Sequence, residues 1–178
     1  MENNRTNQNL KDFVDSLQAE WLEEVPNLKA DPISVVARLV RLNYYIERRV
    51  DSNFSRYGLT RGEFEVLAVL TRNPHKEITP KILQTKILIT SGGLSNRISK
   101  LEAKGLLVRE LDPTDRRGVI LRVTPKGRAL TLSAVNSHME TEQALIKGLS
   151  VSERATLASL LKKLIVTQDQ KLTKDALP

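Results

Sequence analysis

The chain has 178 residues, which fits one domain or one domain with an appendage, and its 40% apolar and 28% charged residues are typical of a folded protein. It contains no cysteine, which excludes disulfides, cysteine metal clusters and thiol redox switches. The net charge of +7 favours an acidic partner such as nucleic acid or an anionic surface. Residues 1–10 are polar, and no apolar run approaches the length of a membrane span. We therefore expect a cytoplasmic protein without a membrane partner.

The positive charge is concentrated in one segment. Residues 79–128 contain eleven basic and four acidic side chains, so this segment alone carries a net charge of +7. The remaining residues contain 17 side chains of each sign and are neutral. Because a solvated lysine-rich face normally mixes both signs, this localisation favours a binding site for a polyanion.

Apolar spacing and capping residues predict a mainly helical chain after a disordered stretch over residues 1–9. Asp31 is expected to cap a helix with Pro32 at its first position, and the segments Thr60–Glu63 and Ser150–Glu153 read as capping boxes. Gly58 and Gly105 are expected to end helices. The predicted helices cover residues 10–24, 33–57, 61–72, 80–88 and 91–104, with two more that follow caps at Thr124 and Ser150.

Two β-branched, apolar segments flank the polar loop 112–118 and predict a β-hairpin, with strands over residues 106–111 and 119–124. Two short helices, a tight connection and a hairpin inside the basic segment indicate a winged helix-turn-helix. This fold places its second helix in the major groove of DNA. We therefore expect a mainly α protein with a small β-hairpin wing.

The helix over residues 91–104 has two distinct faces. Leu94, Ile98 and Leu101 share the face expected to point inward, and Arg97 lies at the border. Short polar side chains and glycine on the other face suit base edges and phosphates, because they permit close approach. The candidate DNA contacts are Ser91, Gly92, Ser95, Asn96, Arg97, Ser99, Lys100, Arg116 and Arg117. Asp115 is expected to hold a wing arginine in place for the minor groove.

These motifs resemble the MarR family of bacterial transcription regulators. The matching segments are ITSGGLSNRISKLEAKGLLVR over residues 89–109, DPTDRR over 112–117 and LRVTPKG over 121–127. The resemblance implies an intertwined helical homodimer that binds a palindromic operator on double-stranded DNA as a repressor. It also implies release from DNA when a small phenolic or aromatic acid binds between the dimerisation and DNA-binding parts. The implied regions are 1–30 (disordered tip and extra helix), 31–58 and 125–170 (dimerisation), and 60–124 (DNA binding).

A narrower resemblance is to the urate-responsive subgroup of this family, which has an extra N-terminal helix. The resemblance implies an effector site at Trp21, Glu65, Arg72, Arg97 and Arg109. The subgroup has aspartate where this chain has Glu65, so urate and another small aromatic anion both remain open as effectors. A flat indole and planar guanidinium groups suit such an anion.

Simpler roles stay open for each of these residues. Trp21 can anchor its helix, Glu65 with Arg72 can be a surface pair, and Arg97 can hold a phosphate. The polar residues of helix 91–104 can form an ordinary exposed face. His75 and His138 are isolated and are not expected to bind metal, and Tyr44 and Tyr45 are expected to pack.

The sequence contains no nucleophile paired with histidine, no phosphate loop and no metal cluster, so we expect no enzyme activity and no cofactor. The alternative functions are a nucleoid-type protein that binds DNA without sequence preference, and a protein-interaction module that has lost DNA binding.

Overall fold

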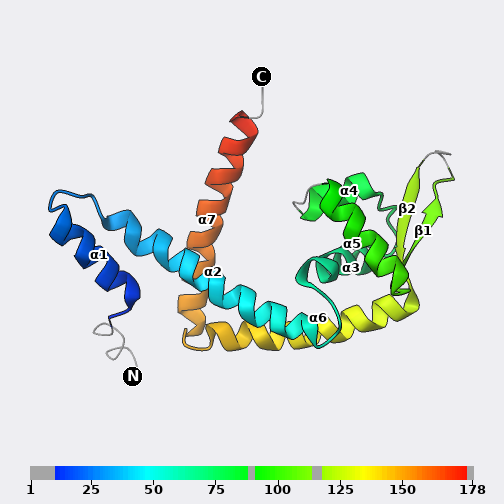
Figure 1. The fold of residues 1–178 in the computed structure, drawn as a ribbon, viewed down its shortest axis with the longest axis horizontal. Helices are drawn as coiled ribbons and strands as arrows, with labels where there is room; N and C mark the ends of the chain where they lie inside the picture. Colours follow the sequence, from blue (N-terminus) through cyan, green and yellow to red (C-terminus); the bar gives the residue numbers. More distant parts are fainter. Residues whose placement is uncertain (1–10, 88–90, 114–117, 176–178) are drawn as a thin grey trace. The chain divides into compact units, whose positions relative to one another are not determined.

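The computed structural model describes residues 11–87, 91–113 and 118–175, and the side chains of these residues up to position 170 except that of Ser91. The chain divides into two compact units, one up to Ser52 and one from Asn53 onward. Within the described ranges, no helix is long and apolar enough to cross a membrane. In chain order (Figure 1), the elements are α1 Phe13–Glu24, α2 Asp31–Ser55, α3 Arg61–Arg72, α4 Pro80–Ile87, α5 Ser91–Ala103, β1 Leu107–Leu111, β2 Val119–Val123, α6 Pro125–Ile146 and α7 Val151–Asp175.

The predicted helices and hairpin are confirmed, with small shifts at two N-termini. Helix α1 begins at Phe13 rather than Leu10, because Asp12 forms a capping box with Asp15. Helix α2 includes Asp31 in its first turn, so this residue is not the N-cap that we expected. The predicted disorder of residues 1–9 lies outside the described residues. The same holds for Thr90, the residue before α5, which the sequence predicts as the cap of that helix.

In the first unit, a forked ionic contact fixes α1 against α2. The Arg38 guanidinium donates to both carboxylate oxygens of Asp12 at 2.8 and 3.0 Å, and to Asp15 at 2.7 Å. The hydrogen bond from Arg38 lowers the pKa of Asp12 from 3.8 to about 2. Val14 is buried, and the Arg41 guanidinium lies 4.5 Å from the centre of the Phe13 ring. Helix α1 is therefore docked by charge as well as by apolar contact.

Two helices end in the same glycine motif. Gly58 follows α2 with a φ of 65°, and Gly105 follows α5 with a φ of 68°. In each case the next residue donates its N–H to a carbonyl five positions earlier: Leu59 to Phe54 at 3.1 Å and Leu106 to Leu101 at 2.9 Å. This is the Schellman arrangement, in which a residue without a Cβ accommodates the left-handed turn. It explains why both predicted helix ends are accurate.

The core of the second unit lies between α3, α5 and the hairpin, which pack together in Figure 1. Leu67, Leu101 and Leu107 are fully buried there. Strands β1 and β2 pair antiparallel, with Leu107 opposite Val123 and Leu111 opposite Val119. The Leu121 N–H also donates to the Ile78 carbonyl at 2.9 Å, which links the hairpin to the segment just before α4.

Candidate DNA-binding surface and effector pocket

Helix α5 presents a polar ridge on the side opposite its apolar contacts. Leu94, Ile98 and Leu101 are at most 2% exposed, as the sequence predicts. The described residues exposed on this helix are Gly92, Ser95, Asn96, Ser99, Lys100 and, at its last position, Ala103. The helix has no acidic residue in its first turn, so its N-terminal dipole is free to attract phosphate. The side chain of Ser91, and the wing residues Asp115, Arg116 and Arg117, lie outside the described residues.

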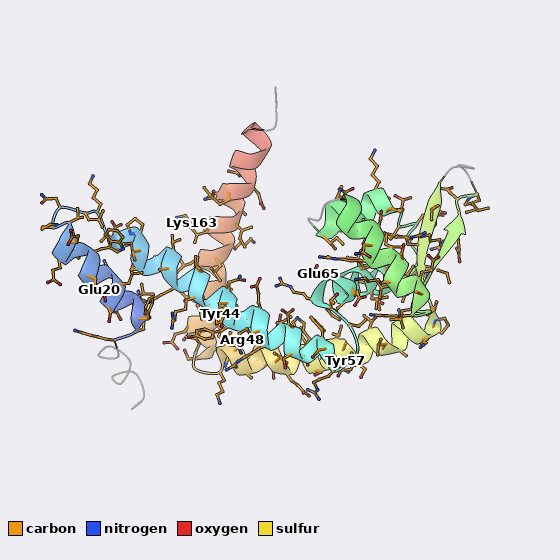
Figure 2. All side chains as sticks on the ribbon, in the orientation of Figure 1. Glu20, Tyr44, Arg48, Tyr57, Glu65 and Lys163 are labelled. Atoms are coloured by element: carbon orange, nitrogen blue, oxygen red, sulfur yellow. The ribbon has the colours of Figure 1, made fainter. Side chains whose placement is uncertain are left out.

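Arg97 does not extend along this ridge but turns towards α3. Its Nη1 lies 3.5 Å from the Glu65 carboxylate, which is also 3.4 Å from the Arg61 Nε. The guanidinium lies against Gly62, where a Cβ atom would come within 2.1 Å of Arg97 Cζ. Because Gly62 has no side chain, the Arg97 guanidinium can pack directly against α3. Figure 2 labels Glu65 on this helix.

A pocket of about 820 Å³ opens between α3, the end of α4, α5 and α6. Apolar side chains supplied by two of these helices line part of it: Phe64 from α3, with Leu132, Val135 and Met139 from α6. Its charged lining residues are Arg61, Glu65, Arg72, Lys86 and Arg97. Four cations against one carboxylate give the pocket a positive balance beside apolar walls. This combination suits a flat organic anion.

The structure divides the predicted effector residues into three groups. Glu65, Arg72 and Arg97 line the pocket. Arg109 on β1 is elsewhere, because it donates to the Ser99 hydroxyl at 3.1 Å and pairs with Glu102 at 3.5 Å. Trp21 lies on α1 in the first unit and is 49% exposed. Among the described residues, Glu65 pairs with Arg61 and Arg97, while Arg72 donates to the Ala68 carbonyl.

Sequence reasoning missed several lining residues, above all those of α6. His138 is one of them: its ring packs on Phe54 and Phe64, with centroid distances of 5.0 and 5.8 Å, and its Nε2 lies 3.1 Å from Glu142. In the described parts of the chain, no three histidine, aspartate or glutamate side chains gather as a metal site. Lys86 was counted only as part of the basic segment, and no sequence signal placed it beside α6.

A polar helix next to a two-stranded wing, in a three-helix core, defines a winged helix-turn-helix DNA-binding protein. The family model of the MarR family matches residues 57–118. The transcriptional regulator PecS of Dickeya dadantii is 33% identical over 150 residues, which cover 83% of this chain and 90% of PecS. The chain belongs to the MarR family of transcriptional regulators, and DNA binding is the property that this family shares.

Solved structures agree with this assignment. A mutant of MarR from E. coli complexed with operator DNA matches with a TM-score of 0.65 and 29% identity, covering 81% of this chain and 96% of that protein. BpsR of Bordetella bronchiseptica, whose DNA binding is regulated by 6-hydroxynicotinic acid, matches with a TM-score of 0.65 and 28% identity, covering 73% and 91%.

Proposed function

We propose that this protein is a ligand-responsive repressor. It binds a palindromic operator as a homodimer and leaves the DNA when a small aromatic anion occupies the pocket between α3 and α6. The observation that carries the proposal is the position of Arg97. This residue belongs to the predicted recognition helix and also lines the pocket, next to Glu65. A ligand that binds this guanidinium would act directly on the helix that enters the groove.

The ridge on α5 supports operator binding. Asn96 is exposed and has the bidentate amide that reads adenine in the major groove, while the exposed Lys100 can neutralise a phosphate. The wing residues Arg116 and Arg117 remain candidates from the sequence, with Asp115 as their orienting partner. DNA-bound MarR has the same fold, which makes the major groove the natural place for α5.

Apolar residues left exposed on two long helices support a homodimer. On α2, Val36 is 57% exposed and Val40 is 67% exposed. On α7, Leu160 is 57% exposed and Ile165 is 59% exposed. Such faces are costly in water and mark contacts with another chain. A second copy is the partner that a palindromic site requires, because a two-fold operator matches a two-fold protein.

The pocket supports a flat, acidic effector. Arg72, Lys86 and Arg97 provide positive charge, and Phe64 and Met139 provide apolar contact. The regulation of BpsR by 6-hydroxynicotinic acid makes this class of compound a reasonable starting point. Arg109 and Trp21 stay candidates for effector binding on the sequence resemblance alone.

Mobility-shift titration with the DNA beside the protein's own gene tests whether the protein binds a specific operator. We expect binding to that DNA to be at least about a thousandfold tighter than binding to random DNA at physiological salt. Equal affinity for both would instead identify a sequence-independent nucleoid-type protein. Analytical ultracentrifugation tests the dimer, and a stable monomer at micromolar concentration would refute it.

A thermal-shift screen with urate, salicylate and 6-hydroxynicotinic acid tests the effector. We expect at least one acid to raise the melting temperature and to release DNA, because a ligand that prefers one of two states shifts the equilibrium towards it. Trp21→Ala is expected to reduce both effects. A panel without any shift would refute the effector pocket and leave DNA binding intact.

A further inference from the structure

Four helix ends meet around Lys104, the last residue before Gly105. Its Nζ donates to the Gly58 carbonyl after α2 at 3.0 Å and to the Glu63 carboxylate in the first turn of α3 at 2.9 Å. Its own carbonyl, at the end of α5, accepts a hydrogen bond from Lys126 in the first turn of α6 at 3.2 Å. One residue therefore connects the recognition helix to the termini of three other helices.

Glu63 is the buried half of this junction. Its side chain is only 4% exposed, against 39% for that of Lys104. Its other oxygen accepts the Thr60 N–H at 2.8 Å, which closes the capping box of α3. Burial alone would raise the pKa of Glu63, but the hydrogen bonds from Thr60 and Lys104 and the ammonium charge outweigh it and lower the pKa. The Glu63 carboxylate therefore stays ionised, and the Lys104 ammonium neutralises its charge.

The surrounding contacts give the junction a defined geometry. The Thr124 hydroxyl donates to the Gly105 carbonyl at 2.9 Å, and the Thr124 N–H donates to the Leu106 carbonyl at 3.1 Å. The carbonyls of the three residues that follow α5, positions 104–106, thus accept hydrogen bonds from Thr124 and Lys126 at the start of α6. A buried anion with a single ammonium partner tolerates little displacement, because an unpaired buried charge is costly.

We propose that Glu63 and Lys104 are positioning residues for operator binding, and that they hold α5 at the angle at which its polar ridge enters the groove. Neither residue needs to contact DNA in this role. The inference rests on the proposed use of α5 as the recognition helix. Beyond that function, we infer that the orientation of α5 is set at its C-terminal end, where Lys104 contacts the ends of α2, α3 and α6.

The competing explanation is that Lys104 is one more phosphate contact of the basic segment. The two explanations predict opposite signs for Glu63→Gln. A protein that only attracts phosphates should bind DNA more tightly when an acidic charge is removed. A positioning pair should bind less tightly, because the loss of the charge weakens the bond that orients α5.

The experiment measures operator affinity as a function of salt concentration for the full chain and for the variants E63Q, K104M, K104R and E63Q/K104M. Circular dichroism gives the melting temperature of each protein, and binding is measured well below it. The operator is the DNA fragment that the unmodified protein binds. Glu77→Gln is the matched control, since Glu77 is an exposed acid of the same unit. If the unmodified protein binds no DNA, the proposed function fails, and this inference fails with it.

We expect E63Q and K104M each to lower affinity about tenfold with an unchanged salt slope, and the double variant to cost no more than either single one. K104R is expected to bind more weakly than the unmodified protein, because one ammonium nitrogen donates to both Glu63 and the Gly58 carbonyl, and a larger planar guanidinium does not reproduce this geometry. E77Q should bind as tightly or slightly more tightly. Unchanged or tighter binding by E63Q, full affinity of K104R, or a salt slope lowered by about one in K104M would overturn the proposal.

Discussion

The guanidinium of Arg97 on α5 lies 3.5 Å from the carboxylate of Glu65 on α3, over a helical glycine that leaves room for it. The contact is long for an ion pair and is partly exposed, so it contributes little to stability. Its interest is geometric, because it directs a basic side chain of the recognition helix into the pocket and away from the polar ridge.

Gly62→Ala is expected to force Arg97 away from α3, since the added Cβ would come within 2.1 Å of Arg97 Cζ. We expect the affinity for an aromatic acid to fall about tenfold, the typical effect of losing one charged contact. Isothermal titration with the acid found in the thermal-shift screen measures this. Gly92→Ala is the matched control, because a Cβ there meets nothing within 4 Å. Equal acid affinity for both variants and the unmodified protein would contradict the role of Gly62.

Asn96→Ala and Lys100→Ala are expected to affect DNA binding in different ways, although both residues are exposed on α5. Loss of the amide should cost about 1–3 kcal/mol against the preferred base and relax specificity at one position. Loss of the ammonium should weaken binding to all sequences and reduce the salt slope by about one. Binding to a library of operator variants at several salt concentrations separates the two. Identical profiles for both variants would argue against α5 as the reading helix.

Leu101→Ala is expected to destabilise the second unit by about 2–5 kcal/mol, because Leu101 is fully buried and truncation leaves a cavity. Urea unfolding followed by circular dichroism measures the loss. Leu111→Ala serves as the control: Leu111 is 79% exposed, and its removal should change the free energy of unfolding by less than about 0.5 kcal/mol. A small effect at Leu101 would mean that α5 is not held by its apolar face.

Acid is expected to undock α1. The pKa of Asp12 is lowered in the folded state, from 3.8 to about 2, so its contribution to stability is present above pH 3.8 and is lost as the pH falls towards 2. Trp21, the single tryptophan, lies on α1 and reports the change through its fluorescence. In Asp12→Asn the docking should already be weaker at neutral pH, and the acid transition should disappear. An identical acid transition in that variant would rule out the Asp12–Arg38 contact as its origin.

Local signals in the sequence predicted the elements well, because caps and glycines act within a few residues of themselves. Thr60 with Glu63, and the turns at Gly58 and Gly105, are examples. The pocket was only partly predictable. The resemblance names Glu65 and Arg97, whereas His138 lies more than 40 residues beyond both of them in the chain and joins them through the packing of α6 on α3.

Arg109 shows a different limit of the sequence. It was grouped with the pocket residues, but its side chain contacts Ser99 and Glu102 on α5. Alternate residues of a strand point to opposite sides, and the sequence does not say which side faces which helix. The junction at Lys104 was missed because its partners Gly58, Glu63 and Lys126 come from three other segments of the chain. Its lysine looked like any other member of the basic segment.

The hydrogen bond from the Leu121 N–H to the Ile78 carbonyl holds the hairpin at the middle of β2, while residues 112–118 connect the two strands at one end. Insertions or deletions in that connection would leave this hydrogen bond in place. The same bond ties β2 to the segment just before α4, so the two should move together. The length of the connection between the strands can therefore differ among related regulators while the packing of the folded core stays the same.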